Sequence, residues 1–215
     1  IHHINKWAHN KLLEKDQDES TSRPQVGMLD SAFSAYMTRF NRFSRTRIAR
    51  LHQPRTKAMN ARNVGWEEAL ASGNCATLHI RRGDNMNRCS NGELNFCSMN
   101  LTLANYMEHA VPMLRQLGDS KHVFVMTDDA EVVADDKLKE WQQKGYFLEV
   151  ISGHNQYSKL TYNDWDPFIE SLYVGHMCRA VVGHHISTVS KLVYNLICAR
   201  FVVCPLVDMM NHVRL

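Results

Sequence analysis

The sequence predicts an α/β fold built on a doubly wound parallel sheet. Between residues 75 and 203, short apolar runs of strand length alternate with longer segments in which apolar residues recur at helical spacing. Strands that are separated by helices are expected to run parallel, because each helical crossover returns the chain to the same end of the sheet. The chain has 215 residues, of which 44% are hydrophobic, so it can bury a full core in one domain with an extension.

The first 70 residues are predicted to form a helical extension and linker. Residues 1–13 have the pattern of a short amphipathic helix, and the charged run 14–24 has no apolar period and is expected to be a linker or loop. Apolar residues recur at helical spacing again over 31–51, whereas 66–73 supports only a turn or two of helix. The sheet is therefore expected within a second region, residues 71–215.

This second region is expected to contain five strands and four helices. The expected strands are 75–80, 123–126, 147–151, 180–182 and 201–203. The expected helices are 103–117, which contains Pro112 and ends at Gly118; 132–144, which stops at Gly145; 166–178, which starts with Asp166 and Pro167; and 187–200.

Polar residues follow three of the expected strands, in the segments 79–84, 127–129 and 183–187. The carboxyl ends of parallel strands meet at one edge of the sheet, which is where open α/β sheets bind ligands. Arg81 and Arg82 lie at this edge, and a guanidinium group can pair two phosphate oxygens at once. A phosphate-binding pair and a surface salt-bridge pair are equally consistent with these two residues alone.

Each of the other two segments also has an ordinary explanation. The Thr-Asp-Asp sequence 127–129 is typical of a turn with a helix cap, and His184 is typical of a packed or solvated histidine. Ser187 can cap the following helix, whose first amides would then face an anion. Because all three segments converge, we favour a nucleotide or sugar-nucleotide pocket, and since there is no glycine-rich cradle, side chains must bind the phosphates.

Composition excludes several other classes of function. A net charge of +3 is too small to indicate a nucleic-acid surface, so no nucleic-acid partner is expected. No run approaches the roughly 18 apolar residues of a membrane span, and the first residues lack the layout of a signal peptide, so any targeting segment is expected to lie outside this sequence. The two pairs of adjacent histidines, at 2–3 and 184–185, lack further ligands at a spacing that suits a metal ion, so no metal site is expected.

The six cysteines favour an oxidising compartment. Cys89 and Cys97 flank a polar loop that a disulfide could close, whereas Cys178 and Cys198 fall on apolar helical faces, where buried thiols are expected. Asn100 begins an N-glycosylation sequon just beyond the loop. Together these features predict a secretory or extracellular location.

Three motifs, taken in order, resemble the GDP-fucose fucosyltransferases of the alpha-1,6 and protein O-fucosyltransferase kind. His79-Ile-Arg-Arg-Gly-Asp84 is similar to the family's His-x-Arg-Arg-x-Asp signature, and Phe124-Val-Met-Thr-Asp-Asp129 is similar to its strand that ends in Thr-Asp-Asp. Val182-Gly-His-His-Ile-Ser-Thr-Val-Ser190 is similar to its closing serine-rich loop, and the segment 36–41 resembles the one that precedes the sugar-nucleotide domain. The likeness covers about residues 34 to 205.

The resemblance implies a GT-B fold, of which 71–215 would form the Rossmann-like, donor-binding half. It implies an inverting, metal-independent transfer of fucose from GDP-fucose to a glycan or protein acceptor, in the Golgi or ER lumen, with no cofactor besides the donor. It implies that Arg81, Arg82 and Asp84 are catalytic. The donor-binding residues that it implies, with Glu170 as the nearest candidate for reading the guanine edge, are His79, Asp128, Asp129, Glu170, Ser171, Gly183, His184 and Ser187.

Two departures from the family pattern support an alternative. The alpha-1,6 enzymes carry a lysine directly after the signature and a glutamate four residues further on, where this chain has Asn85 and Cys89. The acceptor-aligning half of a GT-B enzyme is not among these residues, and we expect it upstream or on a partner chain. The alternative is a catalytically inactive, fucosyltransferase-like binding or structural component of a secreted or extracellular assembly.

Overall fold

The structure is a computed structural model, and it describes residues 46–47, 50, 53, 57–59, 61, 65–82, 101–152, 165–184, 187–201 and 206–210. The helix expected at 1–13, the linker at 14–24 and most of the helix at 31–51 lie outside the described residues. The same is true of several residues that the sequence singled out, namely Asp84, Asn85, Cys89, Cys97 and Asn100. The division at residue 70 stays a prediction.

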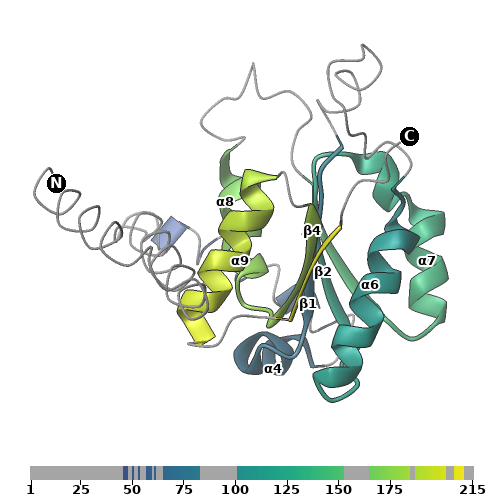
Figure 1. Cartoon of the computed structure of the whole chain (residues 1–215), viewed down its shortest axis with the longest axis horizontal. Helices are drawn as coiled ribbons and strands as arrows, with labels where there is room; N and C mark the ends of the chain where they lie inside the picture. The colour runs from purple at the N-terminus through teal and green to yellow at the C-terminus, as the bar shows by residue number, and fades with distance from the viewer. Residues whose placement is uncertain are drawn as a thin grey trace, which may run out of the picture.

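A five-stranded sheet forms the centre of the described part (Figure 1). The strands are β1 (Ala76–Ile80), β2 (His122–Thr127), β3 (Phe147–Ser152), β4 (Ala180–His184) and β5 (Leu206–Met210). Their spatial order is β3-β2-β1-β4-β5, and every neighbouring pair is parallel. The predicted doubly wound α/β class is confirmed, and the direction of winding reverses between β1 and β4.

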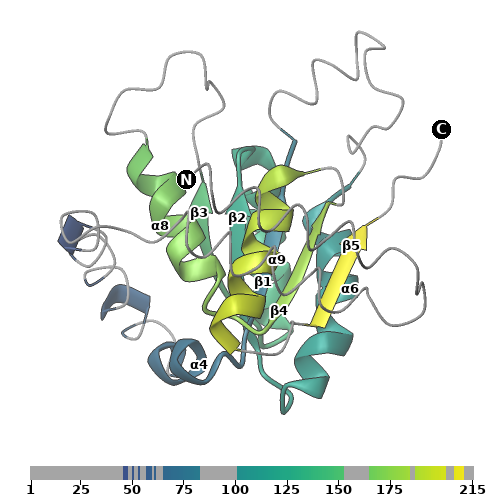
Figure 2. The ribbon, with the colours of Figure 1, turned by 60° about the vertical axis from the view of Figure 1, so that its left-hand side comes forward.

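Helices cover both faces of the sheet (Figures 1 and 2). On one face lie α6 (Leu103–Gln116) and α7 (Asp135–Gln143), which pack against the sheet through residues such as Tyr106 and Trp141. On the other face lie α4 (Trp66–Ser72), α8 (Trp165–Gly175) and α9 (Thr188–Phe201). Each face therefore has its own hydrophobic core.

The strands are mostly apolar because the inner strands are buried on both faces, although polar residues such as His79 and Glu149 are buried within them. All five residues of β1 are buried, and successive side chains point to opposite faces of the sheet. Leu78 and Ile80 join the core beneath α6, whereas Phe124 and Val181 of the neighbouring strands join the core beneath α8 and α9. This period of two continues past the strand ends and decides where the polar residues of the sheet edge point.

Two expected elements are corrected by the structure. The helix expected at 132–144 is divided into a 3-10 helix, η1 (Ala130–Val133), and α7, because Ala134 between them is extended at φ −55° and ψ 148°. The strand expected at 201–203 is wrong at Phe201, which is the last residue of α9, and the final strand is Leu206–Met210 instead. Phe201 continues the helical period of α9, and residues 202–205 lie outside the described residues.

The expectation that Cys178 and Cys198 are thiols is also wrong. Helix α8 ends at Gly175, and Cys178 lies in the turn before β4, where it forms a disulfide with Cys75, with the two Cα atoms 4.7 Å apart. Cys198 is disulfide-bonded as well. The Cys75–Cys178 bond joins the starts of the neighbouring strands β1 and β4, so it ties together the two strands between which the winding reverses.

Among the described residues, no helix is long and apolar enough to cross a membrane.

Candidate functional site

The register of β1 and β2 determines how the polar residues at their ends pair. Ile80 lies opposite Thr127 in this parallel pair, so the residues that follow bring Arg81 beside Asp128 and Arg82 beside Asp129. Successive side chains point to opposite faces of a sheet. One arginine and one aspartate are therefore directed to each face, Arg81 with Asp128 on the side of α8 and α9, and Arg82 with Asp129 on the side of α6.

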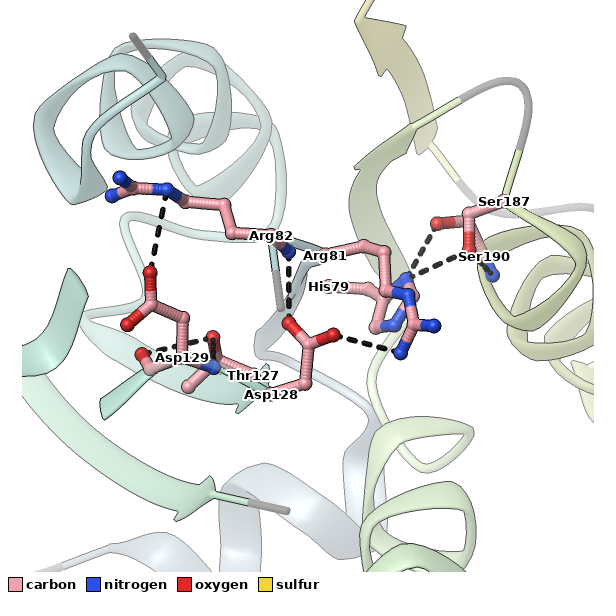
Figure 3. Close-up of polar contacts among 8 residues, drawn as sticks. All are labelled: His79, Arg81, Arg82, Thr127, Asp128, Asp129, Ser187 and Ser190. Carbon is pink, nitrogen blue, oxygen red and sulfur yellow. Dashed lines mark hydrogen bonds and ion pairs between the residues drawn. The ribbon is translucent and has the colours of Figure 1, made fainter. Parts of the chain in front are cut away.

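The Asp128 carboxylate connects both arginines. Its Oδ2 lies 2.7 Å from Nη1 of Arg81, and its Oδ1 accepts a hydrogen bond of 2.8 Å from the backbone N–H of Arg82. The Arg82 side chain instead forms an ion pair with Asp129, at 3.4 Å between Nε and Oδ2. Figure 3 shows the two guanidinium groups extending in opposite directions from β1. Each guanidinium group therefore has its own aspartate.

The turn after β2 keeps both aspartates in place. The Thr127 hydroxyl accepts a hydrogen bond from the backbone N–H of Asp129 at 3.1 Å, and Asp129 in turn accepts one from the N–H of Glu131 at 3.0 Å, capping η1. The turn and helix cap expected at 127–129 are therefore present, and Asp129 contacts Arg82 as well. A role of the two aspartates in a nucleotide pocket stays a prediction.

Arg82 lies in a largely buried environment. Its side chain is 12% exposed, and the ring of Tyr106 from α6 is fully buried nearby. Burial raises the pKa of Tyr106 above its ordinary value, while Arg82 lowers it and Asp128 raises it by smaller amounts. Within the described segments, the Tyr106 hydroxyl has no hydrogen-bond partner. These contacts suit Arg82 to holding the end of β1 in place.

The other face of the edge carries a histidine and two serines, which meet where the winding reverses (Figure 3). Nδ1 of His79 lies 2.7 Å from the Ser190 hydroxyl and 3.5 Å from the Ser187 hydroxyl. Ser187 caps α9 as predicted, because its hydroxyl accepts from the N–H of Ser190 at 3.4 Å. Burial, followed by the charge of Arg81 and the proximity of His184, lowers the pKa of His79 to about 3, so the ring is neutral at physiological pH.

The remaining predicted site residues that the structure describes are buried. Gly183 and His184 form the end of β4, and the backbone carbonyl of His184 accepts from the N–H of Ser187 at 2.9 Å. Glu170 and Ser171 lie in α8, and the Ser171 hydroxyl donates to a carbonyl of its own helix, that of Phe168, at 2.7 Å. A role for these two in reading the guanine edge stays a prediction.

The geometry of this edge suits an anion. Arg81 is 20% exposed whereas its counterion Asp128 is 5% exposed, so solvent or a ligand meets the cation first. A guanidinium group carries five N–H donors in a planar fork that matches phosphate. Ser187, partly buried, adds a hydroxyl beside it. In the described part of the chain, no group of three or more His, Cys, Asp or Glu side chains is placed to hold a metal ion.

Two residues of this edge were not assigned a role from the sequence. Ser190 closes the third motif, but only the structure places its hydroxyl between β1 and β4. Tyr106 has the spacing of an ordinary core residue of its helix. The available signal for Ser190 was a polar residue on the buried face of a helix, since buried hydroxyls nearly always have a partner.

Comparisons with known proteins add one structural likeness. No protein-family model matches the sequence, and no curated protein matches it. Among solved structures, a similar chain is that of POFUT1 in complex with GDP-fucose, with 13% sequence identity and a TM-score of 0.47. The alignment covers 75% of this chain and 46% of that chain, so this chain spans less than half the length of that protein.

Proposed function

We propose that this chain is the donor-binding half of a GT-B fucosyltransferase, which transfers fucose from GDP-fucose to a glycan or protein acceptor with inversion and without a metal ion. The observation that carries the proposal is the placement of Arg81. Its guanidinium is fixed by Asp128 at the carboxyl end of β1, beside the switch point where open α/β sheets bind ligands. The three motifs that resemble the fucosyltransferases supply the residues around it.

Arg81 would act on the leaving group. As the bond between the fucose C1 and the β-phosphate oxygen breaks, negative charge grows on the diphosphate. The acceptor hydroxyl attacks C1 from the opposite side, and its proton passes to the departing diphosphate or to water. A fixed guanidinium stabilises that charge at no cost of reorganisation. Ser187 and His79 add uncharged hydrogen-bond donors. Asp84 remains a proposed contact of the arginines that bind the diphosphate, and Glu170 remains a proposed contact of the guanine edge.

Arg82 and Asp129 would have a supporting role in this proposal. Their ion pair lies on the α6 face, and the backbone of Arg82 is held by the same carboxylate that holds Arg81. They would therefore set the direction in which the chain leaves β1, and through it the position of Arg81. Loss of the Arg82 side chain should affect stability more than donor affinity.

The disulfides support a secretory or extracellular location. Cys75–Cys178 and the disulfide-bonded Cys198 are of a kind that persists in oxidising compartments and is rare in the cytosol. A further disulfide between Cys89 and Cys97 and glycosylation at Asn100 are part of the same proposal.

A second candidate function is a binding or structural component of a secreted assembly that has lost catalysis. Asn85 and Cys89 favour it, because they replace the lysine and glutamate of the alpha-1,6 enzymes. The two functions differ in whether the donor site still recognises its nucleotide sugar. Transfer itself is a less decisive readout, because the acceptor would be aligned by a second half, and that alignment can account for several kcal/mol of a barrier.

The experiment measures the binding of GDP-fucose to this chain, with UDP-glucose as the mismatched competitor. We expect GDP-fucose to bind and UDP-glucose not to displace it. Arg81→Ala should weaken binding by about a hundredfold, and Arg81→Lys should not restore it, since an ammonium group cannot reproduce the planar fork. Arg115→Ala, at an exposed position in α6, is the matched control and should bind normally. Failure of GDP-fucose to bind would favour the inactive component.

A further inference from the structure

Three elements meet at the buried hydroxyl of Ser190. Ser190 in α9 is fully buried, and it lies against His79 of β1 and His184 of β4, whose side chains are 7% and 2% exposed. The backbone N–H of His184 donates to the Ser190 oxygen at 3.0 Å, and Nδ1 of His79 lies 2.7 Å from the same oxygen. This hydroxyl therefore connects the two strands on either side of the switch point, and Figure 3 shows its contact with His79.

Counting the protons fixes the direction of each hydrogen bond. A backbone N–H can only donate, so the Ser190 oxygen accepts from His184. The Ser190 hydroxyl proton then needs an acceptor, and His79 Nδ1 is the one within reach among the described residues. If Nδ1 carried a proton instead, the buried hydroxyl proton would have no partner, which is the unfavourable arrangement for a polar group without access to water. Nδ1 of His79 is therefore an acceptor.

A neutral imidazole that accepts at Nδ1 carries its proton on Nε2. Burial disfavours the positively charged form of the His79 ring, and the nearby charge of Arg81 disfavours it further. The ring is therefore neutral. Nε2 of His79 has no hydrogen-bond partner among the described residues. This N–H donor beside the partly exposed guanidinium of Arg81 thus points to a ligand oxygen as its partner.

We propose that Ser190 is a positioning residue that holds His79 as the Nε2–H tautomer, so that His79 donates this N–H to an oxygen of the bound diphosphate beside Arg81. The ligand part of this inference rests on the proposed function. A neutral donor at this place adds a hydrogen bond to the diphosphate without adding charge that would repel Arg81 or tighten its pairing with Asp128. The hydroxyl of Ser190, rather than its volume, is the group that matters.

The first test reads the tautomer of His79 in the unliganded chain. Two-bond proton–nitrogen correlation spectra of the histidine-labelled chain show which ring nitrogen carries the proton, and His79→Gln identifies the resonances. We expect Nε2–H in the wild type and in Ser190→Thr, which keeps the hydroxyl, and a mixture of tautomers in Ser190→Ala. Thr188→Ala, an exposed position in the same turn, is the control. A wild type with the proton on Nδ1, or an unchanged tautomer in Ser190→Ala, would overturn the inference.

The second test adds GDP. We expect Ser190→Ala to weaken GDP binding roughly tenfold, the effect of one hydrogen bond, and Ser190→Thr and Thr188→Ala to bind like the wild type. GDP should also shift the Nε2 resonance of His79 in the wild type. A wild type with the expected tautomer but no affinity for GDP would overturn the proposed function and the ligand part of this inference. GDP binding that Ser190→Ala leaves unchanged would overturn the inference alone.

Discussion

The ion pair between Arg81 and Asp128 can be tested by a double-mutant cycle in unfolding free energy. The cycle consists of the wild type, Arg81→Gln, Asp128→Asn and the double variant. Asparagine keeps an oxygen at the position that accepts the backbone N–H of Arg82, so the cycle isolates the charge pair from that hydrogen bond. Its coupling energy measures how firmly Asp128 holds the guanidinium.

The expected magnitude follows from the burial of the two partners. Asp128 is 5% exposed and Arg81 is 20% exposed, with 2.7 Å between the charged atoms. Removing one partner of a buried pair leaves an uncompensated charge, so Arg81→Gln should cost about 3 kcal/mol, the lower end of the range for buried pairs because Arg81 is partly exposed. Ion pairs in which both partners are exposed have coupling energies below about 1 kcal/mol. For Arg81 and Asp128 we expect a coupling energy of about 2 kcal/mol.

The assay is urea unfolding of all four proteins, with the m-values compared to confirm that only stability changes. The chain contains its own control. Lys144 and Glu140 are 2.6 Å apart in α7 but 48% and 58% exposed, and their cycle should give a coupling below about 0.5 kcal/mol. A coupling for Arg81 and Asp128 no larger than this control would refute the view that Asp128 fixes the arginine.

Three further outcomes are expected from the described contacts. Because the pKa of His79 falls to about 3 on folding, the unfolded chain takes up the proton first as pH falls below 6.5. Stability should therefore drop by about 2 kcal/mol between pH 7.5 and 5, and His79→Gln should remove that component from urea titrations at the two pH values. The Cys75–Cys178 bond joins residues 103 apart, so replacing both with alanine should cost up to about 4.7 kcal/mol in unfolding without reductant. Tyr106→Phe should leave the unfolding free energy unchanged or raise it, because the buried hydroxyl has no partner among the described residues, and a loss above about 1 kcal/mol would contradict this.

Local pattern was sufficient for most of the sheet. The strands at 76–80, 122–127, 147–152 and 180–184 match the expected runs to within two residues at each end, because strands buried on both faces have mostly apolar sequences. Helix ends marked by glycine were equally clear, as at Gly118, whose φ of 77° suits glycine best. The cap of α9 by Ser187 follows from the same local chemistry.

The features that required the structure depend on which strands are neighbours. Arg81 and Arg82 are adjacent in sequence, which leaves open whether they act as one pair or as separate ion pairs. The period of two directs them to opposite faces and gives each its own aspartate. The Cys75–Cys178 bond depends on the neighbouring positions of β1 and β4, which no local pattern encodes. The register of two strands, once known, is enough to predict the pairing of the arginines.

The most direct test of the proposed donor site is a crystal structure of this chain with GDP in the presence of a chelator. We predict that a diphosphate oxygen lies within hydrogen-bond distance of the Arg81 guanidinium and of the Ser187 hydroxyl, with Arg82 still paired to Asp129 on the α6 face. A diphosphate bound by Arg82 on that face, or bound away from the switch point between β1 and β4, would contradict the proposed site.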